Sequence, residues 1–363
     1  MKVAISAVET SGDLIGAKLV SALKTQNSKI QIQGLAGDKM LEAGCTQLWE
    51  TRRVNVMGFS EVLKKLGALL KLRKAIIRYF SSNKPDVFIG VDGPDFNFTI
   101  ERKLKRRGIK TVHFISPSVW AWRESRVKKI KQSTDLVLCL FPFEVDFYQK
   151  HNQRAVFVGH PLAQSLRPRE NYQSTNNILL MPGSRKAEVN RLLPELLAAA
   201  KIMAQKNHNL TFHLALADDE LRDWAQSLIQ DAGMDVRVST GDAHQRASQS
   251  DLVLVASGTA ALELALLGVP MVVVYKLSAF SYFIASKLVK IKHVSLPNII
   301  ANQALVPELI QDAANGENIA QHAMEILNSD TQSLTQSFKN IHQQLDLNAS
   351  EESAKIIKEF INE

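Results

Sequence analysis

Residues 252–263 read Leu252-Val-Leu-Val-Ala-Ser-Gly-Thr-Ala-Ala-Leu-Glu263. The first five residues are an unbroken apolar run, which is typical of a β-strand buried on both faces of a sheet. Ser257, Gly258 and Thr259 then make a short polar turn, and the residues after them favour a helix. A buried strand that leads through a turn into a helix is the repeating unit of a parallel α/β sheet.

The same order recurs along the chain in two series of apolar segments. The first series contains Val3–Val8, Ile30–Leu35, Val87–Val91, Thr111–Ile115, Leu136–Leu140 and Ala155–Val158. The second contains Ile178–Met181, Thr211–Ala217, Val236–Val238, Leu252–Ala256 and Met271–Tyr275. Amphipathic segments lie between them, including Gly16–Thr25, Val189–Lys206 and Ala260–Leu267. This alternation predicts parallel sheets with crossover helices.

A polar, proline-containing segment at 161–177 separates the two series and is typical of an interdomain linker. The length of 363 residues is enough for two domains, each with its own core. We therefore predict Rossmann-like domains over residues 1–165 and 166–342. In such sheets, ligands bind beyond the carboxyl ends of the strands.

The composition is that of an ordinary globular protein, with 45% hydrophobic and 22% charged residues. The net charge of +8 suits nucleic acid, an acidic membrane or a phosphorylated small molecule, but it equally serves solubility. No nucleic-acid-binding signature accompanies it, which argues against nucleic acid. Cys45 and Cys139 are far apart, and no histidine or cysteine cluster indicates a metal. Reduced cysteines and the absence of a signal peptide favour a cytoplasmic location.

Two strand-end turns of the first half carry carboxylates. Glu9, in Val8-Glu-Thr-Ser-Gly-Asp13, either faces a polar substrate or belongs to an ordinary helix-capping turn. Asp92 follows the strand 87–91, where a carboxylate is costly unless it is hydrogen-bonded or used. Partial desolvation suits a general base, so we favour a catalytic role for Asp92.

A loop rich in tryptophan follows the next strand. It reads Ser116-Pro-Ser-Val-Trp-Ala-Trp-Arg123 and contains Ser116, Trp120, Trp122 and Arg123. Its aromatic faces suit sugar rings or acyl chains, whereas the alternative is that the tryptophans anchor the core.

The second half contains two turns that suit a diphosphate. Pro182-Gly-Ser-Arg185 ends a strand and opens a helix, so that backbone amides and the Arg185 guanidinium can bind phosphate. Ser257, Gly258 and Thr259 open a second helix, and Glu263 one turn later can accept hydrogen bonds from a ribose. Asn298 either holds phosphate or sugar or stabilises its own turn.

Together and in this order, these motifs resemble the lipid-A-disaccharide synthase family. The resemblance runs from residue 9 to residue 298, and the Ser-Pro-Ser-Val-Trp-Ala-Trp-Arg run is its most specific part. It implies a GT-B fold, in which two Rossmann-like domains face a central cleft and C-terminal helices at 343–363 return to the first domain. It also implies an inverting transfer, without metal or cofactor, from UDP-2,3-diacylglucosamine to 2,3-diacylglucosamine 1-phosphate (lipid X).

Site roles follow from the resemblance, motif by motif. Asp92 is expected to be the general base, Glu9 is a second candidate catalytic residue, and the loop at Ser116 is expected to contact the acceptor. The expected UDP-sugar-binding residues are Arg185, Ser257, Gly258, Thr259, Glu263 and Asn298.

Acylated substrates imply contact with a bilayer, and 58–80 is a basic amphipathic segment that suits an anionic inner-membrane surface. The alternative is a helix that packs its apolar face on the core. The expected membrane-facing residues are Phe59, Val62, Leu63, Leu66, Leu69 and Leu70. The sequence thus predicts a peripheral enzyme on the cytoplasmic face of the inner membrane, with homo-oligomerisation left open.

Two other functions also fit the residues. One is a different GT-B enzyme that uses a UDP-sugar, such as a UDP-N-acetylglucosamine 2-epimerase. The other is a non-catalytic membrane adaptor that binds lipid or nucleotide, which would not need a base at Asp92.

Overall fold

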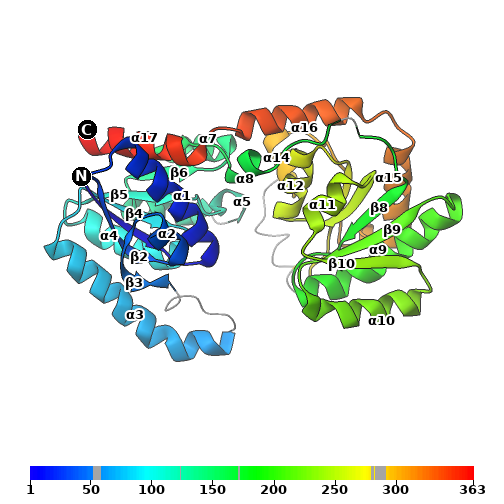
Figure 1. Ribbon diagram of the computed structural model, residues 1–363, viewed down its shortest axis with the longest axis horizontal. Coiled ribbons are helices and arrows are strands. Elements are labelled where there is room, and N and C mark those ends of the chain that lie inside the picture. The colour runs from blue at the N-terminus through cyan, green and yellow to red at the C-terminus, as the bar shows by residue number, and fades with distance from the viewer. Residues whose placement is uncertain (52–58, 123, 171, 279–281, 283–291) are drawn as a thin grey trace. The chain divides into compact units, whose positions relative to one another are not determined.

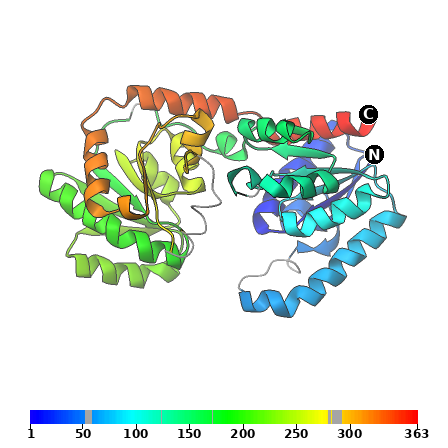
Figure 2. The same ribbon diagram turned by 180° about the vertical axis from the view of Figure 1, so that it is seen from behind.

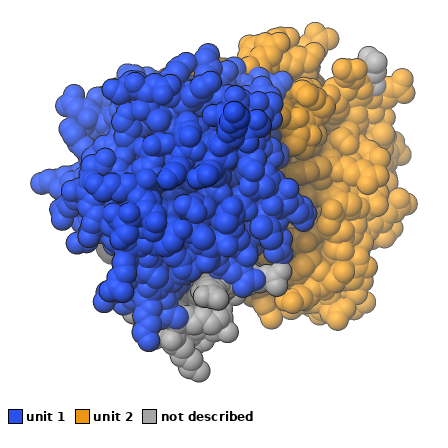
Figure 3. Space-filling model, turned by 60° about the vertical axis from the view of Figure 1, so that its left-hand side comes forward, with its two compact units in different colours: residues 1–161, 345–363 blue, residues 162–344 orange. Residues whose placement is uncertain are grey.

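A computed structural model describes residues 1–51, 59–122, 124–170, 172–278, 282 and 292–363, without the side chains of 59–66 and 122. The chain divides into two compact units (Figure 3). Unit 1 contains Met1–Pro161 and Leu345–Glu363, and unit 2 contains Leu162–Gln344. The predicted boundaries were at 165 and 343.

Within the described residues, unit 1 contains a seven-stranded parallel sheet (Figure 1). Its strand order is β3-β2-β1-β4-β5-β6-β7. The strands are β1 (Lys2–Ala7), β2 (Gln31–Ala36), β3 (Thr46–Glu50), β4 (Val87–Val91), β5 (Lys110–Phe114), β6 (Leu136–Cys139) and β7 (Ala155–Phe157). The helices are α1 (Thr10–Gln26), α2 (Asp38–Glu42), α3 (Phe59–Ser82), α4 (Pro94–Lys105), α5 (Val119–Trp122), α6 (Val127–Ser133), α7 (Pro142–Lys150) and α17 (Ala349–Asn362).

Helices cover both faces of this sheet. Side chains of α1 and α17 pack with one set of strand residues, and side chains of α3 and α4 pack with the other set. Figure 1 shows α17 beside α1, and α3 lies on the opposite side of the strands in both Figure 1 and Figure 2. All five residues of β4 are buried, as its apolar run predicts.

Unit 2 has a six-stranded parallel sheet in its described part, with the order β10-β9-β8-β11-β12-β13. The strands are β8 (Asn177–Met181), β9 (Thr211–Leu216), β10 (Val236–Thr240), β11 (Leu252–Ala256), β12 (Met271–Tyr275) and β13 (Glu308–Ile310). The helices are α8 (Pro161–Ser165), which begins at the boundary, α9 (Lys186–Lys206), α10 (Arg222–Ala232), α11 (Ala243–Ser248), α12 (Thr259–Leu267), α14 (Leu296–Ala301), α15 (Gly316–Leu327) and α16 (Gln332–Leu345). Side chains of α9, α10 and α15 form one core with the sheet.

The fold class predicted from the sequence is confirmed, because both units are parallel α/β sheets with helical crossovers. The turn at residues 8–13 offers Ser11 and Asp13 as N-cap side chains for α1, but neither caps it. The helix begins at Thr10, with Glu9 at its N-cap. Asp13 is buried and instead accepts hydrogen bonds from the amides of Gly37, Lys39 and Met40 at the start of α2.

Candidate active site

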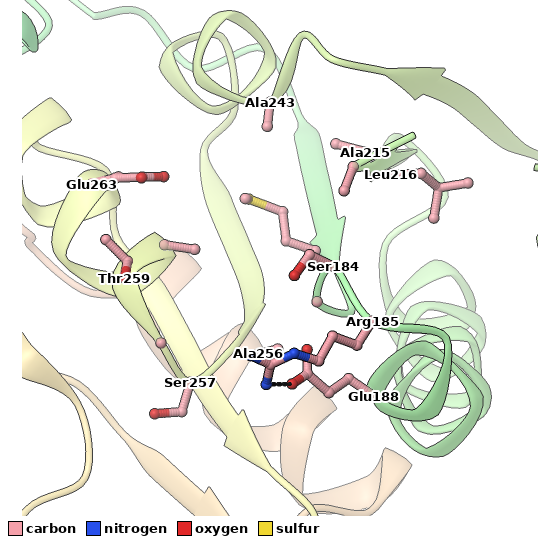
Figure 4. Close-up of a pocket in the computed structure, with 15 residues that line it drawn as sticks. Ser184, Arg185, Glu188, Ala215, Leu216, Ala243, Ala256, Ser257, Thr259 and Glu263 are labelled. Carbon is pink, nitrogen blue, oxygen red and sulfur yellow. Dashed lines mark hydrogen bonds and ion pairs between the residues drawn. The ribbon is translucent and has the colours of Figure 1, made fainter. Parts of the chain in front are cut away.

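A cavity of about 390 Å³ lies in unit 2 at the carboxyl ends of β8, β9 and β11 (Figure 4). Both predicted phosphate-binding turns contribute to it, one from β8 to α9 and one from β11 to α12. Its lining consists of Met181, Gly183, Ser184, Arg185, Glu188, Ala215, Leu216, Ala217, Ala243, Ala256, Ser257, Gly258, Thr259, Ala260 and Glu263. The cavity therefore unites five of the six residues predicted to bind the UDP-sugar.

The first turn is shaped by Gly183. Its φ of +110° is favourable for glycine, and a Cβ there would lie 2.7 Å from Glu188 Oε2. The sharp turn places Arg185 at the N-cap of α9. Backbone amides at such a helix start attract anions.

Arg185 supplies an exposed cation to this pocket. Its side chain is 82% exposed, and Nη1 lies 3.1 Å from Glu188 Oε1 (Figure 4). Exposed ion pairs contribute little to stability, so this guanidinium can exchange its partner for a phosphate at small cost. The fork of the guanidinium can then bind two phosphate oxygens at once.

The second turn leaves open space for a ligand. Gly258 is the N-cap of α12, and a Cβ built on it would meet no heavy atom within 4 Å. Ser257 donates its amide to Val274 O at 2.8 Å and its hydroxyl to Val294 O at 3.3 Å. Glu263 lies one turn into α12 and contacts His244 Nε2 at 3.0 Å. Ser257 thus holds the turn through hydrogen bonds to neighbouring backbone, while the space at Gly258 stays open.

Asn298 is the predicted binding residue that does not line this cavity. It is fully buried, its Nδ2 donates to Val306 O and Glu308 Oε1, and its Oδ1 accepts from the amides of Leu305 and Val306. These bonds correspond to the alternative role of stabilising the turn. Direct contact with a UDP-sugar stays a prediction, and it would require Asn298 to exchange these bonds.

The end of β4 in unit 1 presents a carboxylate in unusual surroundings. Asp92 adopts a left-handed backbone with φ of +53°, and its Oδ1 accepts the Val8 amide at 3.1 Å. Its Oδ2 is buried and has no hydrogen-bond partner among the described residues. Burial, and secondarily the charge of Glu9, raise the pKa of Asp92 to about 7, although the nearby amides of Val8 and Glu9 offset part of this rise. A carboxylate with this pKa can take up a proton near neutral pH.

Gly12, on α1, makes room for this carboxylate. A Cβ on Gly12 would lie 1.8 Å from Asp92 Oδ2, so only glycine fits. Glu9 is exposed at the N-cap of the same helix. The structure brings Asp92 and the Glu9 turn together, because the strands that precede them, β1 and β4, are neighbours in the sheet.

The tryptophan-rich loop is anchored on α7. Ser116 is buried, and its hydroxyl lies 3.1 Å from that of Tyr148. Trp120 packs edge-on against Phe143, with ring centroids 4.7 Å apart. The Trp122 side chain and Arg123 are outside the described residues.

Sequence reasoning missed Glu144 beneath this loop. Its Oε2 accepts the amides of Leu140 and Phe141, and burial raises its pKa to about 7, offset in part by Ser116. Phe141 is the N-cap of α7, and a phenylalanine side chain cannot accept a hydrogen bond, so residues 141–144 lack the Ser or Thr of a capping box and gave no sequence signal for Glu144. His244 was also missed, because nothing in its sequence neighbourhood links it to Glu263.

Of the predicted membrane-facing residues, the structure describes the side chains of two. Leu69 is partly buried and packs on the core of unit 1, whereas Leu70 is 45% exposed. Phe59, Val62, Leu63 and Leu66 lie outside the described side chains. In the part of the chain that the structure covers, no helix is long and apolar enough to cross a membrane.

Comparison with known proteins assigns the chain to a family. The sequence matches the lipid-A-disaccharide synthetase family model over residues 3–360. The chain belongs to the lipid-A-disaccharide synthase family. The matched region includes the predicted site residues of both units, since residues 9–298 lie inside it.

Individual relatives agree with this assignment. Lipid-A-disaccharide synthase from Colwellia psychrerythraea is 41% identical over an alignment of 366 positions that spans 98% of this chain and 93% of that protein. Lipid-A-disaccharide synthase from Actinobacillus pleuropneumoniae serotype 7 is 41% identical over an alignment of 377 positions that spans 99% of this chain and 96% of that protein. The family resemblance drawn from the motifs is therefore confirmed, as is assignment to a family of glycosyltransferases.

Solved structures agree on the fold alone. S. aureus MnaA, in a co-structure with UDP, has a TM-score of 0.64 at 14% identity, with coverage of 99% of this chain and 96% of that one. UDP-GlcNAc 2-epimerase from Neisseria meningitidis, bound to UDP-GlcNAc, has a TM-score of 0.61 at 13% identity and covers all of both chains. These likenesses confirm the GT-B fold class.

Proposed function

We propose that this chain is a lipid-A-disaccharide synthase. It joins UDP-2,3-diacylglucosamine to lipid X and forms the β-1,6-linked lipid A disaccharide 1-phosphate and UDP. The observation that carries this proposal is the family match over residues 3–360, together with relatives of that name at 41% identity along almost the whole chain. The UDP-GlcNAc 2-epimerase from Neisseria meningitidis shares the fold at 13% identity, and this likeness does not extend to its reaction.

We place UDP in the unit 2 cavity. A diphosphate needs cationic and N–H donors, and the cavity offers Arg185 and the starts of α9 and α12. The turn at Ser257–Thr259 supplies hydroxyl and amide donors, and Glu263 can accept from the ribose hydroxyls. These groups stabilise the charge that collects on the diphosphate as it leaves.

We assign the proton-transfer step to Asp92. The 6-hydroxyl oxygen of lipid X attacks the anomeric carbon of the donor as the bond from that carbon to the diphosphate oxygen breaks. The bonding pair leaves with UDP, and Asp92 accepts the hydroxyl proton. Attack from the face opposite UDP inverts the anomeric centre, through an oxocarbenium-like state. The support for Asp92 is its place at the end of β4, its unpaired buried Oδ2 and its raised pKa.

Further contacts complete the proposal for unit 1. The charge of Glu9 helps to keep the pKa of Asp92 raised. The acceptor is contacted by the residues of the tryptophan-rich loop, Ser116, Trp120, Trp122 and Arg123. The amphipathic α3 meets the anionic cytoplasmic face of the inner membrane, supported by Leu70 at its surface and by the basic residues Lys71, Lys74 and Arg78.

Release of UDP tests the proposed reaction directly. The purified chain is incubated with UDP-2,3-diacylglucosamine, with and without lipid X, in the presence of a chelator. We expect stoichiometric UDP and disaccharide only when lipid X is present, and no loss of rate with the chelator. Isomerisation of the donor without transfer would favour an epimerase, and UDP-sugar binding without any product would favour an adaptor.

A further inference from the structure

A buried amide lies directly behind Asp92. Asn97, in the first turn of α4, is fully buried. Its Nδ2 lies 3.0 Å from Asp92 O, 3.2 Å from Val91 O and 3.1 Å from Ser6 O. Its Oδ1 accepts the Ser6 hydroxyl at 2.7 Å. One side chain thus ties the end of β4 to the neighbouring strand β1.

Close packing keeps this amide in place. A Cβ on Gly90 would lie 3.0 Å from Asn97 Cβ and 2.1 Å from Glu101 Oε1, so glycine lets α4 approach β4. One turn further along α4, Glu101 Oε1 contacts His113 Nδ1 at 2.7 Å, and both side chains are fully buried. Because His113 is the partner of Gly90 in the ladder between β4 and β5, this contact fixes the same point of the sheet.

The backbone that this amide holds is a strained one. A non-glycine residue in the left-handed region costs about 1–3 kcal/mol and persists only where its surroundings hold it. Asp92 has φ of +53°. Its amide donates to Phe114 O at 3.1 Å, and its carbonyl accepts from Asn97. The peptide groups on both sides of the Asp92 Cα are therefore fixed, which directs the carboxylate toward Val8 and Gly12.

We propose that Asn97 is a positioning residue for the glycosyl transfer. Its amide holds Asp92 in the left-handed conformation and thereby keeps the unpaired carboxylate oxygen where the acceptor hydroxyl must deliver its proton. This inference rests on the proposed function, in which Asp92 is the base. A displacement of about 1 Å at a reacting group can cost on the order of 100-fold in rate, so a brace of this kind is kinetically significant.

The test compares Asn97→Ala with a matched control, Gln153→Ala. Gln153 is also a buried amide of unit 1 that donates to two backbone carbonyls, those of Asp135 and Arg154. It lies just before β7, at the amino ends of the strands, away from Asp92. Both variants lose buried hydrogen bonds, so both are expected to lower the melting temperature.

Only Asn97→Ala should change the chemistry. We expect kcat to fall by roughly 10- to 100-fold, while KM for the UDP-sugar and the Kd for UDP stay within about twofold of wild type. The acid limb of kcat/KM should move to lower pH, because a released Asp92 carboxylate gains solvent and loses part of its raised pKa. Wild-type kcat and an unmoved acid limb, beside a lowered melting temperature, would overturn the proposal.

A milder variant covers the case in which Asn97→Ala does not fold. Ser6→Ala removes the hydroxyl that orients the amide and should lower kcat in the same direction by a smaller factor, whereas an unchanged kcat and pH profile would count against the brace. Asp92→Asn distinguishes the role of Asp92 as the base from the positioning role of Asn97. If Asp92→Asn is inactive but both brace variants behave as wild type, only the positioning role fails. If Asp92→Asn is fully active, the assigned base fails and the positioning role with it.

Discussion

The turn after β4 and the turns after β8 and β11 all lie at the carboxyl ends of parallel strands, but they are built in opposite ways. In unit 1, a Cβ on Gly12 would strike Asp92 Oδ2 at 1.8 Å, so the turn is filled by protein. In unit 2, a Cβ on Gly258 would meet nothing within 4 Å. The charged group of unit 1 is buried and raised in pKa, whereas the Arg185 side chain is 82% exposed.

This difference indicates a division of labour. The packed, strained turn of unit 1 fixes one carboxylate in a single position. A general base needs such a fixed position, because it must lie within hydrogen-bond reach of the proton that it accepts. An open turn with backbone amides and an exposed guanidinium suits a polyanion that must enter and leave. We therefore assign chemistry to the unit 1 turn and nucleotide binding to the unit 2 turns.

The largest effect is expected from filling the space at Gly12. Gly12→Ala should displace the Asp92 carboxylate and lower kcat by roughly 100-fold, with the Kd for UDP unchanged. The control is Gly16→Ala on the same helix, whose Cβ would meet the flexible end of Met40 at 2.7 Å. Steady-state kinetics and calorimetric titration with UDP measure both quantities. Equal losses of kcat in the two variants would mean that the effect is general unfolding of α1.

The next largest effect is expected at the open, nucleotide-binding turns of unit 2. Arg185→Ala should weaken UDP binding by roughly 10- to 150-fold, since a charge-assisted contact is worth about 1.5–3 kcal/mol. Lys186→Ala, at the adjacent exposed residue outside the cavity, should leave the Kd within about twofold. Calorimetry provides the measurement. Equal weakening by both variants would reduce the role of Arg185 to general positive charge.

The pH dependence sharpens the chemical side. As a base, Asp92 must be ionised, and its pKa is raised to about 7, so activity is lost as pH falls through that value. Below the limb, kcat/KM should decline about tenfold per pH unit. Glu144 also has a pKa of about 7, so Glu144→Gln is the control and should keep the limb. Disappearance of the limb in that variant would transfer the titration to Glu144.

The smallest effect concerns the membrane face of unit 1. Leu70→Ser should reduce binding to anionic vesicles by a few-fold and leave the melting temperature unchanged, since Leu70 is 45% exposed. Leu69→Ser should instead lower the melting temperature, because Leu69 packs on the core. Leu41→Ser, at another exposed leucine of unit 1, is the control for vesicle binding. Equal binding by Leu70→Ser and Leu41→Ser would argue against this face.

Much of this arrangement could be predicted from the sequence, and particular residues show where it could not. The fully apolar runs at 87–91 and 252–256 gave strands with the observed bounds. The edge strands β3 and β13 were missed: Thr46–Glu50 mixes polar and apolar residues, and Glu308–Ile310 is only three residues long. Turn motifs located Asp92 and Arg185, because parallel strands bring their carboxyl ends to one edge.

The roles of Asn97 and Asn298 could not be predicted, because they depend on three-dimensional contacts. Ser6 and Asn97 are separated by 91 positions, and no spacing rule pairs them. Asn298 is a side chain of the kind that binds ligands, and its hydrogen bonds to Val306 and Glu308 were not visible in the sequence. Both examples are buried polar groups whose partners depend on tertiary packing, which local patterns do not encode.

The division of labour is tested most directly by two variants measured side by side. Asp92→Asn keeps the shape of the side chain and tolerates the left-handed backbone, while Arg185→Ala removes the exposed cation. Rates of disaccharide formation and the Kd for UDP are determined for both. We predict that Asp92→Asn lowers kcat by at least about 100-fold at an unchanged Kd, and that Arg185→Ala chiefly raises the Kd. A near-normal rate in Asp92→Asn, or a loss of UDP binding in it, would contradict the account.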